Sequence, residues 1–313
     1  MECKIEEKGS ERVGIMGIDE EVQKIKEKYG IVGRNSEIRK ILMAIKAGKH
    51  VLLEGSVGIG KTLMARSIAE HLKRGFIRVD GDERLTEGKF IGYWDPPMVI
   101  NKGYVKEAFI EGPLTRAALS GSVLFINELN RLSESAQNAL LPVMDEGIIS
   151  IPHFGTLKAK KEFIIIATQN PEESIGVTRL SEALKDRFVL VRLDYQSEEE
   201  EKEIVRQRAG VNKDEIVSYS VKIVRKTRED PNIRRGASVR AAIDMALLAK
   251  TYGRELSPED WLEIALMILP ERIDIREDLK PRRDEIIRRI VEKVLGEEVV
   301  EENFLFLRGQ EPR

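Results

Sequence analysis

The chain has 313 residues, of which 42% are hydrophobic, 34% are charged and 5% are aromatic, a length that predicts about two domains with a sizeable core. Its 52 Lys and Arg nearly balance its 54 Asp and Glu, which argues against a nucleic-acid binder that relies on bulk positive charge. A single cysteine excludes an intramolecular disulfide, and the absence of a signal peptide or a long apolar run predicts a cytoplasmic protein without a membrane segment.

Five short apolar runs alternate with helix-like segments and predict an α/β domain over residues 30–196, after a charged extension at residues 1–29. Each run is rich in Val, Ile, Leu or Phe, which is typical of strands buried on both faces of a parallel sheet. The runs are His50–Leu53, Phe76–Val79, Val123–Ile126, Phe163–Ala167 and Phe188–Leu193. Strands that alternate with helices indicate a five-stranded parallel sheet covered by helices.

The rest of the chain shows helical periodicity and no convincing pair of strands. A Ser-Pro start at Ser257 has an acid three residues after the cap, as a capping box requires. A later helix is predicted over Arg282–Leu295, with its end at Gly296. The pattern therefore predicts a small all-α domain over residues 197–275 and a terminal helix and tail over residues 276–313.

A phosphate-binding loop lies between the first predicted strand and the helix that follows it. The motif G-x-x-x-x-G-K-[ST] is matched by Gly55, Ser56, Val57, Gly58, Ile59, Gly60, Lys61 and Thr62, with Leu63 next to it. Its glycines let backbone N–H groups point at phosphate oxygens, and the helix N-terminus adds positive potential. Lys61 is expected at the β- and γ-phosphates and the Thr62 hydroxyl at Mg²⁺. A chance Gly-rich turn is disfavoured by the flanking strand and helix.

The third run delivers two polar residues, Asn127 and Glu128, beside this loop. P-loop ATPases usually have an Asp that helps to hold Mg²⁺ at the first position and a Glu that activates water at the second. Glu128 fits its position, whereas Asn127 supplies an amide oxygen without a charge. One hypothesis is that Thr62 and the phosphates hold most of the Mg²⁺ and hydrolysis is slow. The other is that Asn127 is a neutral variant.

Several motifs in order resemble the MoxR branch of the AAA+ ATPases, over residues from about 30 to 273. The family's Asp-Glu-Ile-Asn-Arg is similar to Asn127–Arg131, and its Ala-Thr-Gln-Asn-Pro matches Ala167–Pro171. The segment Glu182–Phe188 is similar to Glu-Ala-Gln-Leu-Asp-Arg-Phe, with Leu-Lys in place of Gln-Leu. Gly236–Ala241 resembles Gly-Ala-Ser-Pro-Arg-Ala of the helical lid, and Ile31–Arg34 precedes the loop at the family's distance.

The resemblance implies a P-loop AAA+ fold with a helical lid, and it implies roles for single residues. Asn170 would be the first sensor that orients the attacking water, and Arg240 the second sensor on the lid. Arg187 would be an arginine finger for a neighbouring subunit. Ile31 and Val32 would line the adenine pocket. Each of the polar residues could instead serve the local structure, Asn170 in a turn and both arginines on the surface.

Taken together, the residues and the resemblance predict an ATPase that uses ATP and Mg²⁺ in a homo-oligomer, expected to be a hexameric ring. The work implied is chaperone-like remodelling or maturation of a partner, often one with a von Willebrand factor A domain. A nucleotide-gated scaffold with weak hydrolysis is the alternative that Asn127 suggests. A magnesium-chelatase-like motor and a DNA-remodelling motor are further alternatives, the latter disfavoured by the balanced charge.

Two inserts stand apart from the sheet pattern and concentrate aromatic residues. One contains Tyr93, Trp94 and Tyr104, and the other, Gly147–Gly155, alternates like a hairpin and contains Phe154. One hypothesis is that these aromatic side chains contact a polypeptide partner. The alternative is a local cluster that supports the two loops.

Overall fold

The computed structural model describes residues 17–171 and 180–308, and its centre is a five-stranded parallel sheet in the order β2-β5-β8-β1-β9. The strands are β1 (His50–Glu54), β2 (Phe76–Asp80), β5 (Val123–Asn127), β8 (Ile164–Gln169) and β9 (Phe188–Arg192). They coincide closely with the five apolar runs, because the three central strands are buried on both faces. The predicted parallel sheet is confirmed.

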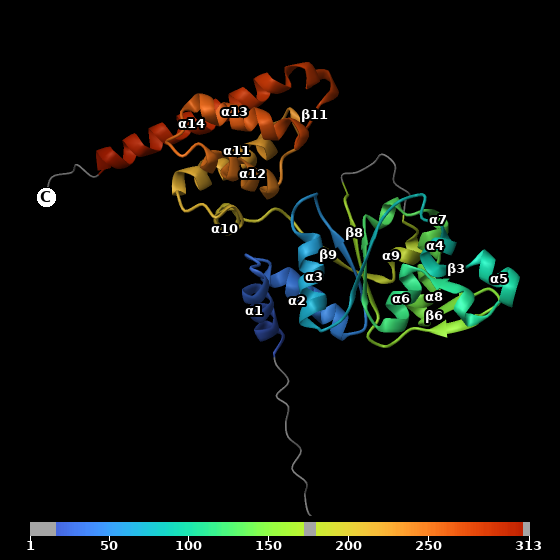
Figure 1. Cartoon of the computed structure of the whole chain (residues 1–313). Helices are drawn as coiled ribbons and strands as arrows, with labels where there is room; N and C mark the ends of the chain where they lie inside the picture. The colour runs from blue at the N-terminus through green and yellow to red at the C-terminus, as the bar shows by residue number, and fades with distance from the viewer. Residues whose placement is uncertain (1–16, 172–179, 309–313) are drawn as a thin grey trace, which may run out of the picture.

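Helices cover both faces of the sheet and form two separate hydrophobic cores (Figure 1). One face carries α1 (Ile18–Tyr29), α2 (Asn35–Lys46) and α3 (Lys61–His71). The other carries α4 (Glu87–Ile91), α6 (Pro113–Ser120), α7 (Glu134–Asn138), α8 (Leu140–Asp145) and α9 (Glu182–Lys185). Val22 and Ile25 of α1 are buried in the first core, so the sheet's packing already begins within the charged segment before residue 30.

Two hairpins lie beside the second core and pack against each other through aromatic rings. They are β3 (Gly92–Trp94) with β4 (Phe109–Glu111), joined through α5 (Pro96–Lys102), and β6 (Ile148–Ile151) with β7 (Gly155–Lys158). Trp94 contacts the rings of Tyr104 and Phe154 and donates its Nε1–H to the Pro152 carbonyl at 3.1 Å. The predicted second hairpin is confirmed, and this packing agrees with a local cluster. Contact of Tyr93 and Tyr104, each 51% exposed, with a partner stays a prediction.

The region from residue 198 onward gathers into a helical bundle with its own core (Figure 1). Its helices are α10 (Glu198–Ala209), α11 (Asp214–Glu229), α12 (Val239–Thr251), α13 (Pro258–Ile268) and α14 (Arg283–Arg308). The predicted capping box at Ser257 is present, with Asp260 as its second member. Short 3-10 turns complete the described chain at Lys106–Ala108, Leu129–Arg131, Leu269–Glu271 and Glu277–Arg282.

Two expectations about the helical region are wrong in detail. A short antiparallel pair, β10 (Ile233–Arg235) with β11 (Asp274–Ile275), lies where no strand pair is predicted. It escapes the periodicity because it has only two or three residues a strand and buries one residue in each. Helix α14 also continues through Gly296 to Arg308, since one glycine weakens a helix but does not end it. Among the described residues, none of the helices is both long and apolar enough to cross a bilayer.

Candidate nucleotide site

The phosphate-binding loop joins the end of β1 to the start of α3, as the motif predicts. Gly55 and Gly58 have φ of 154° and 83°, values that favour glycine. A Cβ on Gly58 would lie 2.3 Å from the Ser238 hydroxyl at the start of α12, so this glycine also lets the helical bundle approach the loop. Lys61 donates from Nζ to the carbonyls of Gly55 and Ser56 at 2.6 and 2.9 Å. The loop thus holds an ammonium group at the N-terminus of α3.

A cavity of about 410 Å³ lies at the carboxyl ends of the central strands and contains most of the polar residues predicted for catalysis. They come from the loop, β5, the end of β8 and α12, and they are Lys61, Thr62, Asn127, Glu128, Asn170 and Arg240. Arg78, Thr168 and Gln169 line the same cavity and are not predicted from the sequence. We call this cavity the phosphate side.

Glu128 follows β5 in a left-handed backbone conformation, with φ of 58°, that an L-residue adopts only when its surroundings hold it there. Its N–H donates to the Thr168 hydroxyl on β8 at 2.9 Å. Its carboxylate forms an ion pair with Arg131 Nε at 2.9 Å, one turn further along the chain. This ion pair occupies Oε2 of the carboxylate, and Oε1 remains to accept from water in the phosphate side.

Asn127 is held by neighbours on both adjacent strands. Its Nδ2 donates to Asp80 Oδ1 at 3.0 Å, and its Oδ1 accepts from the Thr168 hydroxyl at 3.2 Å. Asp80 is ionised near neutral pH, because its hydrogen bonds from Arg78 and then from Asn127 hold its pKa below the usual range. An ionised carboxylate only accepts, which fixes the amide with its NH₂ toward Asp80. Only the second lone pair of Asn127 Oδ1 can serve a metal-bound water.

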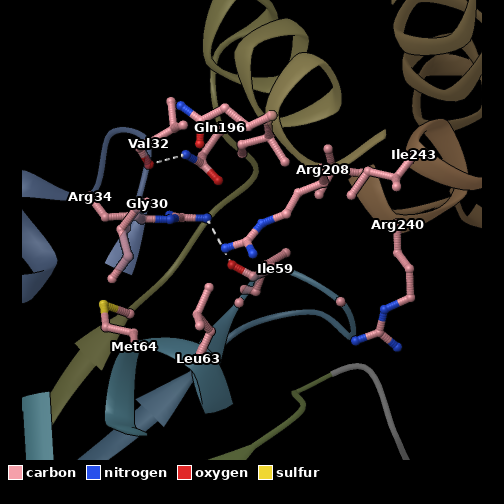
Figure 2. A pocket seen from close by; sticks show the side chains of 16 residues that line it. Gly30, Val32, Arg34, Ile59, Leu63, Met64, Gln196, Arg208, Arg240 and Ile243 are labelled. Atoms are coloured by element: carbon pink, nitrogen blue, oxygen red, sulfur yellow. Dashed lines mark hydrogen bonds between the residues drawn. The ribbon is translucent and has the colours of Figure 1, made fainter. Parts of the chain in front are cut away.

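A second cavity, of about 380 Å³, continues from the phosphate side and lies between the α/β region and the helical bundle (Figure 2). The two cavities share the loop residues Gly58, Ile59 and Gly60 together with Leu63 and Arg240. Apolar side chains line most of the second one, including Ile31, Val32, Leu63, Met64, Ile204, Val239 and Ile243. We call it the adenosine side, because the predicted adenine-pocket residues Ile31 and Val32 lie in it.

Hydrogen bonds from side chains to backbone carbonyls hold the segment before α10 against the segment before α2, at the edge of the adenosine side. Gln196 donates from Nε2 to the Val32 carbonyl at 2.7 Å (Figure 2), and Arg34 donates from Nη2 to the Asp194 carbonyl at 2.8 Å. Figure 2 shows Arg208 reaching from α10 toward the loop near Ile59. The sequence gives no signal for Gln196 or Arg208, since neither belongs to a motif.

Arg187 lies outside both cavities, between α9 and β9. Its guanidinium pairs with both carboxylate oxygens of Asp145 on α8, Nε to Oδ1 at 2.6 Å and Nη2 to Oδ2 at 2.5 Å. A third bond joins Nη1 to the Ala183 carbonyl. The position agrees with a residue that does not act on the nucleotide of its own chain.

The donors present suit Mg²⁺ bound together with a nucleotide. Thr62 offers one neutral hydroxyl oxygen and Asn127 one amide lone pair, and both line the phosphate side. Mg²⁺ commonly takes one or two protein oxygens and completes its shell with phosphates and water. Within residues 17–171 and 180–308, no group of three or more His, Cys, Asp or Glu could hold a metal ion by itself.

Comparisons with known proteins find relatives over most of the chain. A family profile described as an AAA domain of the dynein-related subfamily matches residues 50–188. The gas vesicle ATPase GvpN of Haloferax mediterranei is 30% identical over 258 residues, which cover 77% of this chain and 74% of that protein. YeaC of Bacillus subtilis, described as uncharacterized, is 29% identical over 288 residues, which cover 81% and 87%.

Among solved structures, RuvB of Thermotoga maritima has a TM-score of 0.51 and 20% sequence identity to this chain. The match covers 76% of this chain and 71% of RuvB. At this level of identity the likeness shows a shared fold, in which a P-loop sheet is followed by a helical region.

Proposed function

Because this chain belongs to the MoxR-type AAA+ ATPases, we propose that it hydrolyses ATP with Mg²⁺ and uses the reaction to remodel or mature a partner protein. The observation that carries the proposal is the convergence of Lys61, Thr62, Glu128, Asn170 and Arg240 in one cavity. That cavity continues into an apolar one with room for a base.

In the proposed reaction, Glu128 accepts a proton from a water molecule that attacks the γ-phosphorus. The bond between the γ-phosphorus and the bridging oxygen breaks, and ADP leaves with its charge stabilised by Lys61 and the loop N–H groups. Bound Mg²⁺ would neutralise charge on the β- and γ-phosphates. Asn170 would orient the water, and Arg240 would link the γ-phosphate to α12. The geometry supports these roles because each side chain lines the phosphate side.

Phosphate release from ATP, measured on wild type and on Glu128→Gln, tests this function. We expect wild type to turn over and Glu128→Gln to bind ATP normally while losing about 10²- to 10⁴-fold in turnover, the usual contribution of a general base. Glu134→Gln, which removes an exposed acid from α7, is the matched control and should behave as wild type. Wild type and Glu128→Gln that bind ATP but are equally inactive would favour the nucleotide-gated scaffold that Asn127 suggests.

The oligomer, the partner and the location are also proposals. A finger role for Arg187 requires a neighbouring subunit, and its place outside the chain's own cavities supports a homo-oligomeric ring, expected to be a hexamer. Resemblance to the MoxR branch alone supports a partner with a von Willebrand factor A domain and action in the cytoplasm. Mass measurement with ATP bound to Glu128→Gln tests the ring. Stimulation of wild-type turnover by a purified von Willebrand factor A domain protein, but not by DNA, tests the partner.

A further inference from the structure

The carboxyl end of β2 carries two charged residues, Arg78 and Asp80, that the proposed mechanism does not use. They are two positions apart on an edge strand, so both side chains lie on the same face of the sheet. Arg78 donates from Nη2 to Asp80 Oδ1 at 2.6 Å and from Nε to Oδ2 at 3.0 Å. The two oxygens of one carboxylate therefore fix the plane and direction of the guanidinium.

Arg78 lines the phosphate side together with Lys61, Thr62, Asn127 and Glu128. Arg78 therefore lies in the cavity of its own chain, whereas Arg187 lies outside it and is proposed to act on a neighbouring subunit. The core does not need it, since the Arg78 side chain is 46% exposed. An arginine fork in a cavity already built for phosphate is suited to bind phosphate oxygens with two parallel hydrogen bonds.

Contacts across three strand ends hold Arg78 in this direction. Asp80 stands opposite Asn127 in the register of β2 and β5, and it accepts from the amide of Asn127 at 3.0 Å. Asn127 in turn accepts from Thr168 at 3.2 Å, and Thr168 accepts from the N–H of Glu128 at 2.9 Å. A carboxylate in place of Asn127 would face Asp80 as a like charge at hydrogen-bond distance. The presence of Asp80 thus explains why this position suits an amide.

We propose that Arg78 is a further phosphate-binding residue of the nucleotide site, supplied by the same chain, and that Asp80 and Asn127 position it for the terminal phosphate of ATP. This inference rests on the proposed function, because it requires that the phosphate side binds ATP. It goes beyond that function in naming a cation on β2 and in giving Asn127 a role other than metal binding. The consequence is a preference for ATP over ADP, since the γ-phosphate brings the charge nearest the ends of β2 and β5.

Calorimetric titration with ATP and with ADP, in Mg²⁺ and at one salt concentration, tests Arg78. Against a wild type that binds ATP, we expect Arg78→Ala to lose about 10- to 100-fold in ATP affinity, the usual worth of a charged hydrogen-bond pair, with little change for ADP. Arg78→Lys should recover part of the loss, because it keeps the charge without the fork. Arg66→Ala removes a cation from the exposed face of α3 and should change neither affinity.

An unchanged ratio of ATP to ADP affinity in Arg78→Ala would overturn the inference while leaving the proposed function intact. A wild type that binds neither nucleotide would overturn both. These two results are distinct, so the failure of one claim is not mistaken for the failure of the other.

The positioning roles of Asp80 and Asn127 are tested by exchanging their charges. Asn127→Asp alone should weaken ATP binding several-fold, because two carboxylates then compete for Arg78. The double variant Asp80→Asn with Asn127→Asp keeps one carboxylate and one amide at the strand ends and should recover most of the affinity. Effects of the two substitutions that simply add would overturn the positioning roles, since residues that share one network are not additive.

Discussion

The adenosine side and the phosphate side meet at the same loop, yet they are held together in different ways. The phosphate side is a polar cavity at the ends of β5 and β8, where adjacent strands fix Glu128 and Asn127 through Thr168. The adenosine side is mostly apolar, and its walls come from two regions of the chain, with Ile204 and Ile243 contributed by the helical bundle. Under the proposed function, the chemistry therefore depends mainly on residues at the strand ends, with Arg240 as the bundle's contribution, whereas affinity for the base depends on where the bundle lies.

The largest expected effect is on turnover, and it comes from Arg187, which lies in neither the phosphate side nor the adenosine side. We expect Arg187→Ala to lower turnover by about 10³- to 10⁵-fold, the range for arginine fingers, with ATP affinity nearly unchanged because Arg187 lies outside both cavities. Phosphate release and calorimetry measure the two quantities. Lys185→Ala removes an exposed cation from the same short helix and should turn over as wild type. A turnover within a few-fold of wild type for Arg187→Ala would contradict the finger role.

Substitution of Glu201 on α10 tests whether the stability of the helical bundle affects nucleotide binding in the adenosine side. Its buried carboxylate, 3% exposed, accepts from Arg228 at 2.8 Å and from Arg225 at 3.1 Å. Glu201→Ala removes the acid nearest to both cations, leaves Arg225 only the longer ion pair with Glu198 at 3.8 Å, and should lower the free energy of unfolding by about 3–5 kcal/mol. ATP and ADP affinity should fall together. Denaturant titration checks the first effect, with Glu203→Ala as the control, expected within about 0.5 kcal/mol because its side chain is 46% exposed and pairs only with surface groups.

The first residue of β1, His50, is a titrating group that affects stability but not nucleotide binding. Burial lowers the pKa of His50 to about 4, from its ordinary value of 6.5, and its Nδ1 accepts the N–H of Ile165 at 3.0 Å. The unfolded chain therefore binds a proton that the folded chain refuses between these values. The contribution of His50 to the free energy of unfolding is fully present above pH 6.5. It falls by about 3 kcal/mol as the pH is lowered to 4. Chemical denaturation across this range should show a smaller fall for His50→Gln.

In His50→Gln, the ratio of ATP to ADP affinity should equal that of wild type at every pH, because His50 lines neither cavity. A wild type and a variant with parallel pH profiles of stability would contradict the assignment of this proton to His50.

The smallest effect distinguishes the two sides directly. Ile243→Ala removes part of an apolar wall from the adenosine side, and it should weaken ATP and ADP binding alike, by about tenfold for a partly buried side chain. Leu247→Ala, one turn further along α12 at an exposed position, is the matched control and should change neither affinity. A loss confined to ATP would show that the two sides have been assigned the wrong way round.

How far the sequence predicts these two sides follows from what each requires. A phosphate loop needs particular residue types at fixed spacing, so Gly55–Thr62 can be found by motif. The buried strands can also be predicted, because a short apolar run bounded by turn residues has few structures available to it other than a buried strand. An apolar wall needs only shape, and residues such as Met64 and Ile243 carry no signal of their own.

Other features depend on neighbours that a linear pattern does not contain. The pair of β10 and β11 is too short to show a period, and α14 passes Gly296 because one glycine costs a long helix only about 1 kcal/mol. Arg78 and Asp80 alternate with apolar residues on β2, and this pattern predicts that they share one polar face. Their proposed role cannot be predicted in this way, because it depends on the register that places Asp80 opposite Asn127.

A mixing experiment tests whether one ATPase site is divided between the cavities of one chain and Arg187 of the next. Lys61→Ala should not bind ATP, and Arg187→Ala should bind ATP without turning it over, so each is expected to be inactive alone. In mixed rings, Lys61→Ala can lend its Arg187 to an intact cavity in Arg187→Ala. We predict that phosphate release by the mixture exceeds the sum of the two separate proteins. A mixture whose rate equals that sum, although mass measurement shows mixed rings, would contradict the account.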